Sequence, residues 1–277
     1  MSVIYDLFSQ LPFSWAEYKF MVNAFLAVLL IAPLMGILGT MAVNNKMAFF
    51  SDALGHSAFT GIALGVLLGI ENHFISLVAF GVFIALVITR VKNKGSASSD
   101  TVISVFSSAS IALGLLVLSY GGSFSRYNSY LVGDILSITP TEILLLTITL
   151  VVVAVIWVFI YNKLLVISVN KELAASRGIK TSLYENVFVI VVAVVVMLSI
   201  KWVGILLINS LLILPAASAR NLSRNSRQYL VGSVGLSFVS AISGLLVSFY
   251  ADTSAGATIV AVSTVIFFIT YMISKKK

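Results

Sequence analysis

The sequence contains no cysteine, only two histidines and four prolines, and charged residues make up just 10% of its 277 positions. Without cysteine, a disulfide, a thiolate metal site and a cysteine nucleophile are all excluded. Soluble domains carry about 25% charged residues, so the chain has too little charge for an ordinary water-exposed surface. It also lacks a G-x-x-x-x-G-K-S/T phosphate loop, which predicts that it does not hydrolyse nucleotides by itself.

Apolar residues dominate instead, at 60% of the chain with a mean hydropathy of +1.09. A water-soluble core of this size could not hide so much apolar side chain. A helix needs roughly 20 apolar residues to cross about 30 Å of hydrocarbon. The sequence therefore predicts an all-α, polytopic integral membrane protein with eight to nine transmembrane helices. The nine candidate segments are 19–42, 48–70, 74–90, 102–120, 143–162, 184–200, 203–219, 230–249 and 256–274.

Only Lys201 and Trp202 separate the sixth and seventh segments. One helix over 184–219 would be about 54 Å long, which is too long for a single crossing. A tight hairpin is therefore expected there, and eight spans with one re-entrant segment is the second alternative. Residues 1–17 lack the basic start and cleavage site of a secretory signal. We expect them to form an amphipathic lead-in, with Trp15 and Tyr18 as interfacial anchors.

Basic residues are concentrated on one side of the nine-span arrangement. With nine spans, the other side receives only Lys19, Arg126 and Lys201, and the first side receives the remaining 14 of the 17 basic residues. The positive-inside rule then places the N-terminus outside and the C-terminus in the cytoplasm. The net charge of +7 thus reflects topology and does not predict nucleic-acid binding. With no internal repeat and no soluble domain, residues 1–277 are expected to form one transmembrane domain.

The segment "FSDALGHSAF" places Asp52 and His56 four positions apart within a predicted span. On a helix they lie about 40° apart around the axis and about 6 Å apart along it, so both can face one cavity. A carboxylate with an imidazole suits Zn²⁺ or Mn²⁺, and a two-fold dimer would supply four ligands. The alternative to a metal site is that Asp52 is a simple helix N-cap or first-turn acid and that His56 is a packed core histidine. Asn44 and Asn45 are better placed as caps, which would leave Asp52 inside the helix.

Three glycines, Gly61, Gly65 and Gly69, follow at intervals of four. This spacing predicts a smooth strip on which another helix packs closely.

The stretch "VNKELAASRGIKTS", residues 169–182, predicts a short helix in a loop on the basic side. Asn170 can cap it, Glu172 suits its first turn, and Gly178 suits the C′ position. Between them, Leu173, Ala174 and Ala175 favour helix. The helix is either a docking point for a partner or a simple interfacial connection.

Together these motifs resemble the membrane subunits of bacterial ABC importers for zinc and manganese. "MAFFSDALGHSAFTGIALG" resembles the signature of that family, although Gly55 stands where alanine is common. Further matches follow in order over residues 20–274: "SSDTVISVFSSASIALGL", "YLVGDILSITPTE", "NKELAASRGI" and "VGILLINSLLILPAASAR".

The resemblance implies a homodimeric permease in the bacterial cytoplasmic membrane. Cytoplasmic ATP-binding subunits and an extracytoplasmic metal-binding protein would be its partners. Asp52 and His56 would be the metal ligands of the transport path, with Zn²⁺ favoured over Mn²⁺ as cargo and no permanent cofactor. The segment that presses on the ATPase would comprise Glu172, Leu173, Ala174, Ala175, Arg177 and Gly178.

We therefore expect alternating access driven by ATP hydrolysis on a partner chain. Protonation of His56 should compete with the metal, so affinity should fall below about pH 6. One rival is a stand-alone, proton-coupled secondary transporter or channel, in which Asp52 and His56 form a proton-coupled pair. Another is a membrane scaffold with no transport role.

Overall fold

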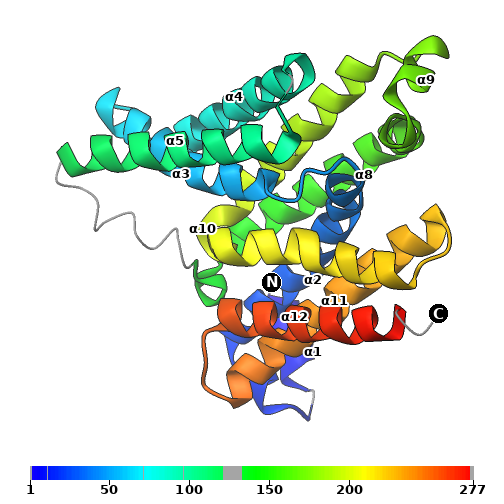
Figure 1. Ribbon diagram of the computed structural model, residues 1–277. Helices are drawn as coiled ribbons and strands as arrows, with labels where there is room; N and C mark the ends of the chain where they lie inside the picture. Colours follow the sequence, from blue (N-terminus) through cyan, green and yellow to red (C-terminus); the bar gives the residue numbers. More distant parts are fainter. Residues whose placement is uncertain (1, 11, 71, 96, 121–132, 275–277) are drawn as a thin grey trace. The chain divides into compact units, whose positions relative to one another are not determined.

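A computed structural model describes residues 2–10, 12–70, 72–95, 97–120 and 133–274, and every regular element in these ranges is a helix (Figure 1). The all-α prediction is confirmed. The elements are α1 (Ser2–Ser9), η1 (Ser14–Glu17), α2 (Lys19–Asn44), α3 (Phe50–Leu67), α4 (His73–Lys94), α5 (Ser99–Tyr120), η2 (Ile135–Ser137), α8 (Pro140–Val169), α9 (Lys171–Ser176), α10 (Thr181–Leu222), α11 (Ser226–Tyr250) and α12 (Ala255–Ser274). Arg126 and the C-terminal lysines, on which part of the topology prediction rests, lie outside the described residues.

Eight helices in the described ranges are long and apolar enough to cross a membrane, with Thr181–Ile200 and Trp202–Leu222 of α10 counted as two. They match eight of the nine predicted segments. The ninth, 48–70, forms α3, which has 18 residues and carries Asp52 and His56 among its apolar side chains. This helix is not one of the eight, because its polar residues and glycines lower its hydropathy. The polytopic membrane architecture is thus established.

The chain divides into two compact units. The first comprises Met1–Thr40, Val132–Val152 and Lys201–Lys277, and the second comprises Met41–Leu131 and Val153–Ile200. The helices α2, α8 and α10 each contribute to both units. The expectation of a single transmembrane domain over 1–277 stays a prediction.

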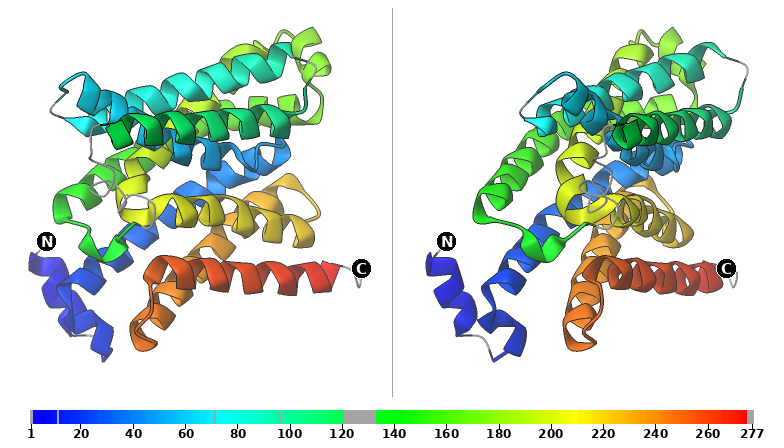
Figure 2. Two further views of the ribbon diagram at one scale, coloured as in Figure 1. Left: turned by 60° about the vertical axis from the view of Figure 1, so that its left-hand side comes forward. Right: turned by 90° about the vertical axis from the view of Figure 1, so that its left-hand side faces the viewer.

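In the first unit, α2 packs closely on α10 and α11. A Cβ added at Gly39 would lie 1.9 Å from the carbonyl oxygen of Leu212, and one at Gly36 would lie 2.9 Å from the Cα of Val234. The Tyr229 hydroxyl also donates to the carbonyl of Thr40 at 3.3 Å. α11 in turn packs against α12, orange and red in Figure 2. Small residues thus let these backbones approach each other directly.

The N-terminal segment, residues 1–17, does not place Trp15 as the sequence predicted. This side chain is only 6% exposed, with its ring centroid 5.0 Å from that of Phe25 and 6.0 Å from that of Phe8. The expectation that Trp15 is an interfacial anchor is therefore wrong, because α1 and α2 enclose the indole ring in an aromatic cluster. Tyr18 is 49% exposed, as an anchor requires.

The long element α10 is broken at Gly204, whose φ of 77° and ψ of 159° are not helical. Glycine adopts this region readily because it has no Cβ. Gly133, with φ 69°, lies against the same turn, and a Cβ added to it would come 2.3 Å from the Gly204 nitrogen. The prediction that 184–219 is not one crossing helix agrees with this break, which lies three residues after Lys201.

The second unit is built around α3, which packs against both α4 and α5. Figure 1 shows these helices lying alongside one another in blue, cyan and green. Thirteen of the 18 residues of α3 are buried. Gly114 of α5 is close enough to α3 that an added Cβ would lie 2.8 Å from the Thr60 nitrogen. The Thr60 hydroxyl donates to the Ser110 carbonyl across the same contact.

Candidate functional site

Asp52 lies in the first turn of α3, because the helix begins at Phe50. The expectation that Asn44 or Asn45 caps this helix is wrong: Asn44 is the last residue of α2, and the Asn45 side chain donates to the Met41 carbonyl at 2.8 Å. Phe49 is the N-cap residue and makes no side-chain capping bond. The carboxylate therefore lies near the positive end of the helix dipole, which lowers the cost of a charge in an apolar unit.

Asp52 and His56 lie on the same face of α3, as their spacing predicted. The Oδ2 atom of Asp52 is 3.5 Å from the Nε2 atom of His56, and the two side chains are 37% and 24% exposed respectively. From α5, the Ser107 hydroxyl donates to the same Oδ2 at 3.4 Å. The other ring nitrogen of His56, Nδ1, is buried without a hydrogen-bond partner in the described structure. The site thus combines one carboxylate, one imidazole and one hydroxyl.

This geometry is compatible with chelation of one metal ion. Two tetrahedral ligands at bonds of roughly 2.0–2.1 Å lie about 3.3 Å from each other. The 3.5 Å between Asp52 Oδ2 and His56 Nε2 is close to that value. Among the described residues, no group of three or more His, Cys, Asp or Glu side chains could hold a metal ion. The described part of one chain therefore offers a metal ion only this pair, and a complete site would need further ligands from outside it.

The three glycines that follow on α3 have different surroundings. A Cβ on Gly61 would lie 3.0 Å from the Cα of Leu77, so α4 packs directly over this position. Gly65 is also buried. The prediction that Gly69 belongs to the packing strip is wrong. Gly69 lies beyond the end of α3, with φ 65° and nothing within 4 Å of an added Cβ. It ends the helix and does not pack against another one.

The short helix of the 169–182 loop forms as its capping signals predicted. It is α9, and the Asn170 side chain accepts from the Leu173 nitrogen at 2.9 Å. At the other end Gly178 has φ 76°, and its nitrogen donates to the Ala175 carbonyl at 2.9 Å. Ala174 is fully buried, whereas Leu173 is 46% exposed. Apart from Ala174, every residue from 171 to 178 is exposed, and the exposed face of α9 with the two residues that follow it includes Glu172, Leu173, Ala175, Arg177 and Gly178.

A polar network joins the start of α9 to two longer helices. The Lys171 ammonium donates to Glu185 Oε2 of α10 at 2.6 Å and to Asn93 Oδ1 of α4 at 3.1 Å. The Asn93 amide also donates to Glu185 Oε2, at 2.8 Å. A displacement of α9 would therefore act on the ends of α4 and α10. Sequence reasoning did not find this network, because its members are up to 92 positions apart.

Sequence reasoning also missed Ser107 and Gly114. Both lie in the quoted segment "SSDTVISVFSSASIALGL", but no residue there was singled out. The sequence does carry a signal for both residues, because small and polar residues inside an apolar span favour close contact between helices.

Comparison with known proteins assigns the family. The profile of the ABC 3 transport family matches residues 17–274. The "High-affinity zinc uptake system membrane protein ZnuB" of Haemophilus influenzae is 31% identical over 251 residues, covering 90% of this chain and 96% of that protein. The "Manganese import system permease protein ScaB" of Streptococcus gordonii is 29% identical over 262 residues, covering 94% of each. The fold resembles the solved structure "PsaBC from Streptococcus pneumoniae in complex with Fab", with a TM-score of 0.80, 24% identity, and coverage of 98% of this chain and 95% of that one. With a family match over nearly its whole length, the chain belongs to the ABC 3 transport family.

Proposed function

We propose that this chain is the membrane permease subunit of an ATP-driven importer of divalent transition metal ions, zinc or manganese. The observation that carries the proposal is the Asp52–His56 pair, with Oδ2 and Nε2 3.5 Å apart, in a member of this family. Alternating access would expose this pair to each side of the membrane in turn, so that the ion binds from one side and leaves on the other. Its few ligands per protomer favour a site weak enough to release the ion again.

Relatives of both metal specificities support the class of cargo. One is named for zinc uptake and another for manganese import, at 31% and 29% identity. A mixed oxygen and nitrogen site accepts either ion. Zinc remains the first expectation from the sequence, and a delivery protein would make the selection between the two.

The incomplete ligand set supports a homodimer. A second copy related by a two-fold axis would bring a second Asp52 and His56, which completes four ligands. Cytoplasmic ATP-binding subunits would dock on the exposed face of α9, and an extracytoplasmic metal-binding protein would deliver the ion. The charge distribution supports a multi-pass protein of the bacterial plasma membrane, with the N-terminus outside and the C-terminus cytoplasmic.

The test is elemental analysis of metal-starved cells that lack this chain and are complemented with variants. Wild type should restore zinc or manganese, and the restored metal identifies the cargo. Asp52→Asn and His56→Ala should each reduce accumulation at least about tenfold, because outer-shell changes alone cost 10–100-fold at metal sites. The matched control is Asp100→Asn, the same substitution in the first turn of α5, where the side chain is exposed.

Equal membrane levels of all variants would be verified by immunoblot. If Asp52→Asn behaves like Asp100→Asn, then Asp52 is an ordinary first-turn acid and the metal site is refuted. The secondary-transporter rival is tested in liposomes. Uptake by this chain alone under a proton gradient would favour the rival, whereas uptake that requires ATP and an ATP-binding subunit favours the importer.

A further inference from the structure

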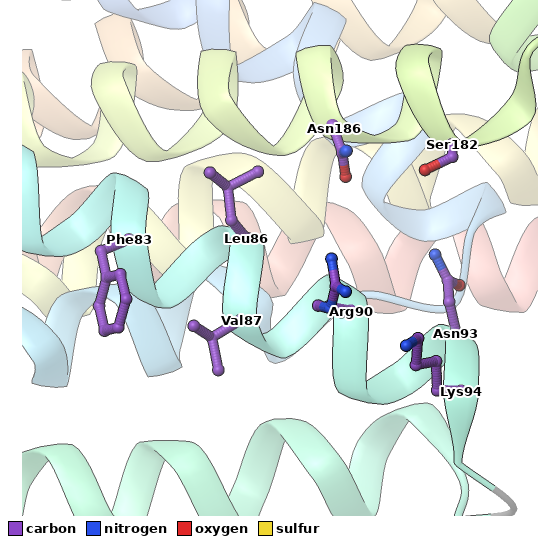
Figure 3. A pocket seen from close by; sticks show the side chains of 8 residues that line it. All are labelled: Phe83, Leu86, Val87, Arg90, Asn93, Lys94, Ser182 and Asn186. Carbon is purple, nitrogen blue, oxygen red and sulfur yellow. The ribbon is translucent and has the colours of Figure 1, made fainter.

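A cavity of about 410 Å³ lies in the second unit between α4 and the first part of α10 (Figure 3). It is separate from the Asp52–His56 pair, since α3 and α5 contribute nothing to its lining. The lining residues are Phe83, Leu86, Val87, Arg90, Asn93, Lys94, Ser182 and Asn186. Its volume is within the range of about 300–1,000 Å³ that is typical of small-molecule sites.

The lining changes character along α4. Phe83, Leu86 and Val87 form the apolar part, and Arg90 and Lys94 follow on the same face at helical spacing. Figure 3 shows Phe83 at one end of the row and Lys94 at the other, with Ser182 and Asn186 of α10 on the side of Arg90 and Asn93. The basic part coincides with the end of a membrane-spanning helix, which extends over Phe74–Lys94. The charge distribution assigns this end of α4 to the cytoplasmic side.

The two cations lack counter-ions in the described structure. Neither Arg90 nor Lys94 takes part in an ion pair among the described residues, and the eight lining residues include no carboxylate. The nearby carboxylate of Glu185 is already neutralised by the Lys171 ammonium at 2.6 Å. The cavity therefore offers two positive charges to an anion from outside the chain.

We propose that this cavity binds an anionic phospholipid, with its phosphate at Arg90 and Lys94. Ser182 and Asn186 would donate to the headgroup, and one acyl chain would lie along Leu86, Val87 and Phe83. Phe83 is 58% exposed, so its ring is available to a lipid chain. Basic pockets between transmembrane helices on the cytoplasmic side are suited to such headgroups. A free phosphate would use the cations but not the contiguous apolar part.

The test measures lipid binding to the full permease with its ATP-binding subunits by native mass spectrometry. Phosphatidylglycerol and phosphatidylcholine with identical acyl chains are added in turn. The wild type should bind phosphatidylglycerol at least tenfold more tightly. In the Arg90→Gln/Lys94→Gln variant, the affinity for phosphatidylglycerol should fall roughly 30-fold, because each lost cation weakens binding about fivefold. The charge-matched control is Lys163→Gln/Arg227→Gln, two exposed residues on the same predicted side, which should retain the preference.

Two further variants keep the test decisive if the double glutamine variant does not fold. Arg90→Lys/Lys94→Arg keeps both charges and should keep binding, whereas Ser182→Trp keeps both cations but fills the headgroup region and should abolish it. Equal binding of the two lipids, or retained binding in Ser182→Trp, would overturn the proposal. So would full competition by millimolar inorganic phosphate, which would identify a free-anion site. Wild-type binding is also measured without the ATP-binding subunits: binding that occurs only in their absence would identify a surface that those subunits cover, and would overturn the proposal too.

Discussion

Gly39 lies at a close contact between the backbones of α2 and α10. A Cβ at this position would lie 1.9 Å from the Leu212 carbonyl oxygen and 3.0 Å from its carbon. These atoms belong to a helix backbone, so they cannot rotate away as the end of a side chain can. Any larger residue must therefore separate α2 from α10.

We expect Gly39→Ala to destabilise the protein by roughly 3 kcal/mol, the upper end for overpacked cores. The matched control is Gly235→Ala on α11, where nothing lies within 4 Å of an added Cβ. That change should be neutral or stabilising by up to about 1 kcal/mol, since alanine favours helix over glycine. Thermal unfolding in detergent measures both. An unchanged midpoint for Gly39→Ala would mean that α2 and α10 are not held this closely.

At the level of single elements, α9 is a short helix held at both ends and on one side. Asn170 caps its start, Gly178 ends it, and Lys171 attaches it to Glu185 and Asn93. Lys171 is 44% exposed, so the ion pair itself adds only about 1 kcal/mol or less to stability. Its main effect is therefore on the position of α9.

Leu173→Asp tests whether α9 is a docking surface. Leu173 is 46% exposed, so the substitution should leave folding intact, but a carboxylate in an apolar contact should reduce the recovery of co-purified ATP-binding subunit roughly tenfold. The control is Leu183→Asp, whose side chain is 55% exposed at the start of α10. Equal recovery with the two variants would show that α9 is only a connection between spans.

For the whole molecule, the orientation in the membrane is the open prediction. The chain has no cysteine, so single cysteines can be labelled without a background. Thr253 and Arg227 suit this purpose because both are exposed: Arg227 lies at the start of α11, a helix of 25 residues, and Thr253 lies three residues after its end. Such a helix is about 37 Å long, enough to place its ends on opposite sides of a bilayer.

In intact cells, we expect an impermeant maleimide to label Thr253→Cys, because that end is predicted to be outside. Arg227→Cys should be labelled only after the membrane is permeabilised. The reverse pattern would invert the topology, and the α9 surface would then face away from any cytoplasmic ATPase.

The sequence by itself determined those features that depend on near neighbours along the chain. The apolar runs predicted the membrane helices, because their length and hydropathy are local properties. Asn170 and Gly178 predicted both ends of α9, since a cap acts within three or four residues. The spacing of Asp52 and His56 placed them on one helix face, because four residues make about one turn.

Tertiary structure alone decided which distant helices meet. It brought Ser107 to Asp52, placed Gly133 against Gly204, and enclosed Trp15 with aromatic rings. It also set the start of α3 at Phe50, which moved Asp52 from the predicted helix interior to the first turn. In an apolar chain nearly every helix face can pack against another, so hydrophobic periodicity does not select partners. Close backbone contacts and a few polar bonds between helices make that selection, and they form only in the folded chain.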